Sequence, residues 1–222
     1  MQKGKSICWQ IITVVFLLGL TSSCQPIMKA MVGVNDIKHL STEKIIKQSK
    51  KYHIPDSNLY VLNDTAYLSF IKTYEGKTIN GRNTFKDLYQ PLQIYGFDNT
   101  NIIQFQLINC TVGGFPNLKW DRYGDFETSP LSMPRTHLSD STLLVNTLTD
   151  YYSAIEPTPD AQSNCNDETI IVYWNKFMGR QSKRLIKTVN DYKENVSSYT
   201  CLYYVNTDNF FYMMNQDTSK TK

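Results

Sequence analysis

The alternation of apolar and polar positions along the chain predicts a mixture of short strands and helices. Apolar runs bounded by turn residues predict strands at 59–62, 66–71, 92–97, 102–110, 170–174 and 200–205. Apolar positions at helical spacing predict helices at 42–52, 83–89, 141–155 and from just after 174 to 195. The last apolar segment, 209–214, leads into a polar tail that we expect to fray.

Two pairs of these strands have predictable partners. Turn residues from Asp98 to Asn101 separate the strands at 92–97 and 102–110, so these two strands are predicted to form a hairpin. A helix joins the strands at 170–174 and 200–205, and a helical crossover of this kind connects parallel strands. The pattern therefore predicts an α/β domain with a mixed sheet.

The first 24 residues have the layout of a secretory signal. Lys3 and Lys5 precede an uninterrupted apolar run from Ile11 to Leu20, and small residues then lead to Cys24. The run is shorter than the roughly 20 residues that a membrane-spanning helix needs. Small residues ending on a cysteine resemble a bacterial lipoprotein signal, in which Cys24 is lipidated and becomes the mature N-terminus.

The match to that signal is not complete. The leucine that is usual three residues before the cysteine is four residues before it here, at Leu20, with Thr21 in its place. Ordinary cleavage and an uncleaved anchor therefore stay as alternatives. The predicted organisation is a signal peptide at 1–23, a tether at 24–40 and a single α/β domain at 41–222, which is long enough to bury its own core.

Charge adds little to this organisation. The net charge of +3 falls by two when Lys3 and Lys5 are removed, and no basic tract of the kind that binds nucleic acid is present. The expected partners are the membrane, through the N-terminal lipid, and an unknown envelope protein. Four lysines of the 42–52 helix could touch anionic headgroups near the anchor or form a solvated helix face: Lys44, Lys47, Lys50 and Lys51.

The C-terminal part resembles the thioredoxin family. Tyr173 and Trp174 close an apolar strand, and Phe177 lies just before a turn that opens a helix. The four residues at 178–181, Met-Gly-Arg-Gln, stand where the family has Cys-Gly-Pro-Cys, and the segment 203–208 resembles the strand that follows in the family. The resemblance covers 141–208 and implies a thioredoxin-like three-layer α/β sandwich with a mixed sheet.

Two departures from the family change what the resemblance implies. Because the chain ends at Lys222, the family's last hairpin and helix have no room after Asp208. We therefore expect a domain that is C-terminally truncated relative to the family and completed by the hairpin at 92–110 and the strands at 59–71. Both active-site cysteines are also missing.

Chemistry at the degenerate turn is limited by its residues, namely Trp174, Phe177, Met178, Gly179, Arg180 and Gln181. Thiol–disulfide exchange needs an attacking thiolate and a resolving thiol. Met178 has no ionisable proton and Gln181 cannot resolve a disulfide, so exchange at this turn is excluded. No catalytic residue and no cofactor is predicted here.

The remaining cysteines and histidines form no recognisable site. If the strands at 170–174 and 200–205 are parallel neighbours, Cys165 and Cys201 lie near the same end and could form a disulfide, with separate reduced cysteines as the alternative. His39, His53 and His137 lack the spacing of metal ligands, so no metal site is predicted.

These features predict a lipid-anchored protein of the cell envelope, with the outer membrane favoured over the inner membrane. By elimination its role is binding or scaffolding by a redox-inactive thioredoxin-like domain. The alternative is an envelope enzyme that uses a site outside the degenerate turn, for instance the thiol of Cys110, Cys165 or Cys201.

Overall fold

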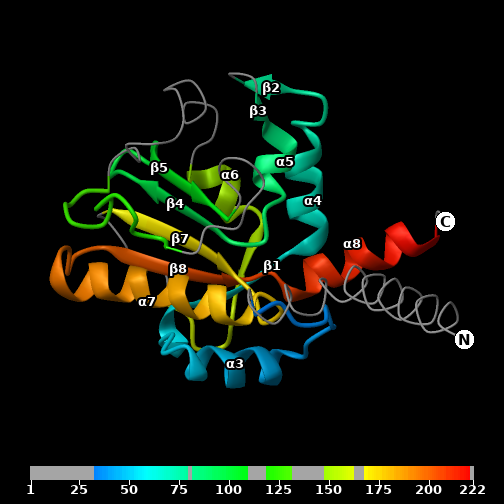
Figure 1. Cartoon of the computed structure of the whole chain (residues 1–222), viewed down its shortest axis with the longest axis horizontal. Coiled ribbons are helices and arrows are strands. Elements are labelled where there is room, and N and C mark those ends of the chain that lie inside the picture. Colours follow the sequence, from blue (N-terminus) through cyan, green and yellow to red (C-terminus); the bar gives the residue numbers. More distant parts are fainter. Residues whose placement is uncertain (1–32, 80–81, 110–118, 132–147, 163–167, 221–222) are drawn as a thin grey trace, which may run out of the picture.

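The computed structural model describes residues 33–79, 82–109, 119–131, 148–162 and 168–220 (Figure 1). The helices in these ranges are α3 (Thr42–Lys51), the 3-10 helix η1 (Asp56–Asn58), α4 (Asp64–Lys72), α5 (Thr84–Leu88), α6 (Leu148–Tyr152), α7 (Gly179–Asn195) and α8 (Asp208–Lys220). The strands are β1 (Leu59–Leu62), β2 (Thr78–Ile79), β3 (Arg82–Asn83), β4 (Gln93–Phe97), β5 (Ile103–Ile108), β6 (Ile155–Pro157), β7 (Thr169–Trp174) and β8 (Cys201–Asn206).

A mixed sheet with the strand order β5-β4-β7-β8-β1-β6 forms the centre of the protein. β7 runs parallel to β8, and β8 runs parallel to β1. β4 is antiparallel to both β7 and β5, and β6 is antiparallel to β1. The predictions of an α/β class, of a parallel pair at 170–174 and 200–205, and of the 92–110 hairpin are confirmed.

Helices pack on both faces of this sheet. Successive side chains of a strand point to opposite faces, and the last two residues of β7 show which helices lie on each. The Trp174 ring meets Tyr52, just after α3, at 5.6 Å between centroids. The Tyr173 ring meets Tyr67 of α4 at 5.6 Å, and Tyr67 in turn meets Phe210 of α8. α3 and α7 therefore cover one face, and α4, α6 and α8 cover the other (Figure 1).

The predicted strand at 66–71 is wrong, because this segment is helix α4. Asn63 caps the helix: its side-chain oxygen accepts a hydrogen bond from the backbone N–H of Ala66 at 3.0 Å. Tyr67 and Ile71, four residues apart, are both buried and form the helix's inner face. The polar tail also differs from the expectation, since α8 continues to Lys220.

The predicted helix at 141–155 is wrong at its C-terminal end. Residues 132–147 lie outside the described ranges, and within them the helix is α6, which ends at Tyr152. Ile155 to Pro157 instead form the edge strand β6, paired with β1. A proline is tolerated there because an edge strand has one unpaired side.

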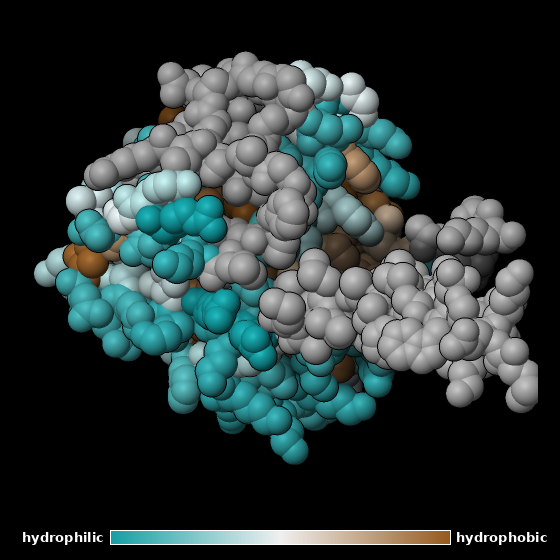
Figure 2. All heavy atoms as spheres, viewed as in Figure 1, coloured by the Kyte–Doolittle hydropathy of each residue, from teal (hydrophilic) through white to brown (hydrophobic). Residues whose placement is uncertain are grey.

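Residues 33–40, expected to be part of the tether, pack against the domain. Leu40 is buried, and its backbone N–H and carbonyl bond to the side-chain amide of Asn209 at 2.8 and 3.0 Å. The folded body therefore includes residue 33, and residues 25–32, outside the described ranges, separate it from Cys24. The surface over α3 and α7 is largely hydrophilic (Figure 2).

Candidate functional site

The degenerate turn, residues 174–181, connects the end of β7 to the start of α7. Phe177 and Met178 are almost completely buried, and Trp174 and Gln181 have no exposed surface. Arg180 is the exposed member of the predicted set. Most side chains of the turn therefore face the protein interior.

Asn175 holds the turn to two neighbouring loops. Its side-chain amide nitrogen donates to the carbonyl of Pro91 at 2.8 Å and to the hydroxyl of Thr207 at 3.2 Å. Its side-chain oxygen accepts from the backbone N–H of Met178 at 2.9 Å. Since Asn175 is fully buried, these bonds fix the turn against the loop before β4 and the loop after β8.

Asp208 provides a second link. Its carboxylate accepts from the backbone N–H of Lys176 at 2.7 Å and from the side-chain amide of Asn206 at 2.8 Å. Burial raises the pKa of Asp208, while these hydrogen bonds oppose the rise. The carboxylate is thus a positioning group, with its acceptor oxygen already used by the backbone of the turn.

An N-terminal strap, residues 33–35, covers the turn from outside. The backbone N–H of Asn35 donates to the carbonyl of Phe177 at 2.7 Å. Gly179 has a φ of +29° and Gly33 a φ of +75°, both in the left-handed region that favours glycine. A Cβ added to Gly33 would lie 2.8 Å from Cβ of Arg180, so strap and turn are in direct contact.

The turn offers no group for proton, electron or thiol chemistry. Met178 contributes a thioether, and Gln181 an amide whose oxygen and nitrogen are both buried without a hydrogen-bond partner. The backbone N–H groups of Gly179 and Gln181 bond to carbonyls at 3.0 and 2.8 Å, so they do not face an anion at the start of α7. The two residues that stand in place of the family's cysteines, Met178 and Gln181, are therefore both buried.

Cys201 is in a disulfide. Its partner lies outside the described residues, as do Cys24, Cys110 and Cys165. Cys201 lies at the start of β8, opposite Thr169 of β7, and its backbone N–H donates to the carbonyl of Glu168 at 2.8 Å. In this state Cys201 has no thiol to act as a nucleophile.

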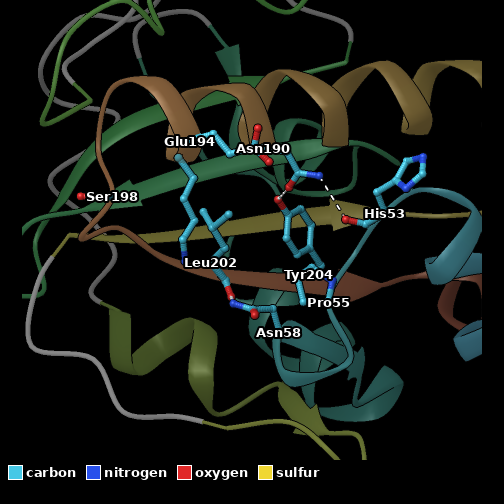
Figure 3. A pocket seen from close by; sticks show the side chains of 9 residues that line it. His53, Pro55, Asn58, Asn190, Glu194, Ser198, Leu202 and Tyr204 are labelled. Carbon is cyan, nitrogen blue, oxygen red and sulfur yellow. Dashed lines mark hydrogen bonds between the residues drawn. The ribbon is translucent and has the colours of Figure 1, made fainter.

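A groove of ≈ 340 Å³ lies beside the other end of α7 (Figure 3). Its polar residues mostly bond to one another. Asn190 accepts from the hydroxyl of Tyr204 and donates to the carbonyl of His53 at 3.2 Å, and Asn58 donates to the carbonyl of Leu202 at 2.7 Å. Burial raises the pKa of Tyr204 above its ordinary value, which keeps the phenol protonated. These hydrogen bonds use the side chains of Asn58, Asn190 and Tyr204, while Lys193 and Glu194 also line the groove.

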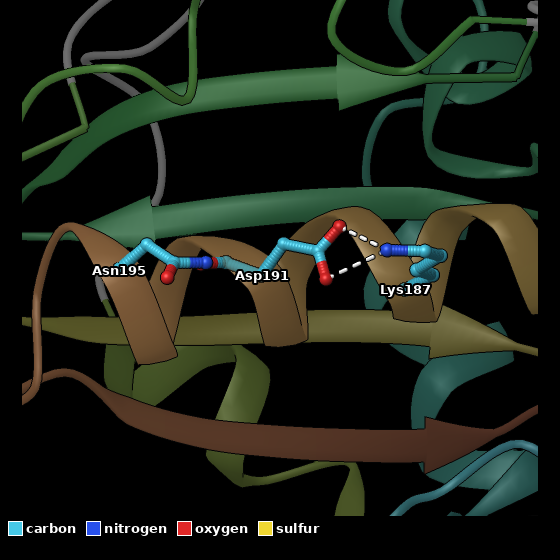
Figure 4. Close-up of polar contacts among 3 residues, drawn as sticks. All are labelled: Lys187, Asp191 and Asn195. Atoms are coloured by element: carbon cyan, nitrogen blue, oxygen red, sulfur yellow. Dashed lines mark hydrogen bonds and ion pairs between the residues drawn. The ribbon is translucent and has the colours of Figure 1, made fainter.

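The outward face of α7 carries a surface ion pair (Figure 4). Lys187 and Asp191 are 2.5 Å apart, one helical turn from each other, and the amide of Asn195 donates to the carbonyl of Asp191 at 2.8 Å. Both charged side chains are at least half exposed, so the pair adds little to stability. This part of α7 is a solvated helix face.

The described residues contain no group of three His, Cys, Asp or Glu side chains that could hold a metal ion. His137 lies outside these ranges. None of the helices described is both long and apolar enough to cross a bilayer.

Asn175, Asp208 and the strap were missed by the sequence predictions. Asn175 and Asp208 follow closely on two parallel strands, whose carboxyl ends lie at one edge of a sheet, and that signal was available. The strap had no comparable signal beyond Gly33. No protein-family model matches this chain, and no curated protein or solved structure matches it either.

Proposed function

We propose that the chain is a lipid-anchored cell-envelope protein whose thioredoxin-like domain binds or scaffolds another envelope protein. The observation that carries the proposal is the state of residues 174–181. They hold no thiol, most of their side chains are buried, and the strap lies over them. A buried turn without thiols serves as a structural element of the domain. The proposed role of the domain is therefore recognition of a partner through its surface.

The thioredoxin-like assignment rests on strand order. The family has a hairpin after its strand-helix-strand unit, at the antiparallel side of the sheet. Here the strand-helix-strand unit is β7-α7-β8, and the hairpin β4-β5 pairs antiparallel with β7 although it precedes β7 in sequence. This arrangement supports a domain that lacks the family's C-terminal hairpin and fills its place from the N-terminal half.

The anchor rests on Cys24 and the residues before it. The apolar run and the small residues end directly on this cysteine. Mass spectrometry of the mature N-terminus tests this part. A diacyl or triacyl group on Cys24 is expected, and an unmodified Cys24 or cleavage elsewhere would contradict the anchor.

Cross-linking in intact membranes tests the binding role. The wild-type chain, solubilised in detergent after cross-linking, is expected to carry one envelope protein in a fixed ratio. A Cys24→Ala chain, which cannot be lipidated, serves as the control for proximity to the membrane. Recovery of the monomer alone, together with turnover in a thiol–disulfide exchange assay, would sink the proposal.

The alternative of a thiol enzyme is weakened by Cys201, which is disulfide-bonded. Cys110 and Cys165 remain to be tested by thiol titration of the folded protein. A single exposed thiol that reacts fast at neutral pH would favour the enzyme, because a lowered thiol pKa is what makes a cysteine nucleophilic.

A further inference from the structure

Helix α3 is basic on one side and buried on the other. Ile45 and Ser49 face the domain with almost no exposed surface. Lys44, Lys47 and Lys51 follow the i, i+3, i+7 spacing and are all exposed, so they form one stripe on the opposite side. The stripe points into solvent at the outer surface of the molecule, where α3 forms the lower edge in Figure 1.

The charge of this stripe is not cancelled within the helix. Lys50 pairs with Asp56 at 3.2 Å and lies beside the stripe. The three stripe lysines have no salt bridge to a described residue. Glu43 is the acidic residue of α3, and a hydrogen bond with Ser41 lowers its pKa and keeps it ionised at the helix N-terminus. With four lysines and one glutamate, α3 carries a net positive charge, and the surface over it is hydrophilic (Figure 2).

The proposed lipid holds this helix close to a bilayer. Gly33 is packed against α7, nine residues after Cys24. A chain of that length spans at most about 30 Å. α3 is anchored to the same place, because the hydroxyl of Tyr52, at its C-terminal end, donates to the carbonyl of Gly179 at 3.1 Å. The short segment between Cys24 and Gly33 therefore keeps α3, and with it the lysine stripe, near the membrane that holds the lipid.

We propose that the stripe of Lys44, Lys47 and Lys51 docks the domain on the anionic headgroups of the membrane that holds its lipid. This inference rests on the proposed anchor and adds the orientation of the domain. α3 faces the bilayer, while the side of the domain that carries α5 faces away and is free for a protein partner. A lysine near an anionic surface contributes about a fivefold gain in binding, and a lipid chain gains stable attachment from such a second signal.

Amine labelling of the lipidated chain tests the orientation. The protein is reconstituted into vesicles of phosphatidylcholine alone or of phosphatidylcholine with phosphatidylglycerol, and lysine labelling is read by mass spectrometry. Lys44, Lys47 and Lys51 are expected to label several-fold more slowly in the anionic vesicles, and to recover in high salt. Lys86, on α5, is exposed and serves as the internal control. Equal labelling of all four lysines in both vesicles would overturn the docking.

A charge-reversal variant gives the second readout. Lys44→Glu, Lys47→Glu and Lys51→Glu together are expected to abolish the dependence of labelling and of vesicle retention on phosphatidylglycerol, whereas Lys86→Glu leaves it intact. A lipidated Cys24 with no such dependence in the wild type overturns only the docking. An unmodified Cys24 overturns the anchor, and the docking with it.

Discussion

The carbonyl oxygen of Gly33 occupies the space that a side chain on Gly179 would need, since an added Cβ would lie 2.7 Å from it. The side-chain nitrogen of Asn35 would lie 2.9 Å from the same Cβ. Gly179 is also the glycine matched to the thioredoxin-type turn. In this chain the absence of a side chain on Gly179 leaves room for the backbone of the strap against the turn.

Gly179→Ala is therefore expected to loosen the strap and lower the free energy of unfolding by about 2 kcal/mol or more, from steric overlap and positive φ together. Urea denaturation measures the loss, and limited proteolysis near residues 33–40 reports the released strap. Gly76→Ala is the matched control: Gly76 has a φ of +73° but no atom within 4 Å of an added Cβ. It should cost about 1 kcal/mol and leave the strap protected. Equal losses in both variants would contradict the packing argument.

Gln181→Met is expected to stabilise the protein by about 1–2 kcal/mol, because the variant removes two buried polar atoms that have no partner. The control is the same change at Gln93, which is equally buried but donates to the carbonyls of Leu88 and Gln90 at 2.9 and 2.6 Å. Gln93→Met should destabilise by about 1–3 kcal/mol. The urea midpoints of both variants are compared with that of the wild type. A lower midpoint for Gln181→Met would contradict the prediction and mean that the Gln181 amide has a hydrogen-bond partner in solution.

Peptide mapping under non-reducing conditions is expected to join Cys201 to Cys165. Cys165 is three residues before Glu168, whose carbonyl bonds to Cys201, and three residues reach at most about 11 Å. Cys110 follows Asn109, which bonds to Leu92 near the opposite end of the sheet. A peptide linking Cys201 to Cys110 would refute this pairing. The reduced protein should lose about 2–4 kcal/mol of stability.

Asp64 is expected to make stability fall as pH rises. Burial raises its pKa to about 6 from an ordinary value of 3.8, and nearby Glu156 adds to the rise. The folded state therefore holds the proton more tightly than the unfolded state, so its contribution is complete below about pH 4 and is lost by about pH 6. Asp64→Asn should remove this decline in urea midpoints measured across that window.

The control for this pH effect is Asp160→Asn, at an exposed position. It should retain the wild-type decline. If Asp64→Asn and the wild type have parallel stability profiles between about pH 4 and pH 6, another group is responsible for the decline.

The apolar pattern predicted the centre of the fold because continuous runs such as Ile170 to Trp174 are buried on both faces of a parallel pair. It failed at α4, because the six residues at 66–71 lack strong periodicity and fit strand and helix alike. In the structure Asn63 caps this helix. The turn was predicted from Trp174 and Phe177, but the strap that covers it packs on the turn through Gly33. That contact joins residues far apart in sequence, which no local pattern specifies.

The sheet order also has a consequence for when this chain can fold. β1 and β4 are made early, yet they are separated in the sheet by β7 and β8, which are made late. After β5, about sixty further residues are made before β7 begins and nearly a hundred before β8 is complete. Closing contacts between such distant segments is slow. The sheet that holds β1 and β4 together is therefore complete only once β8 has been made.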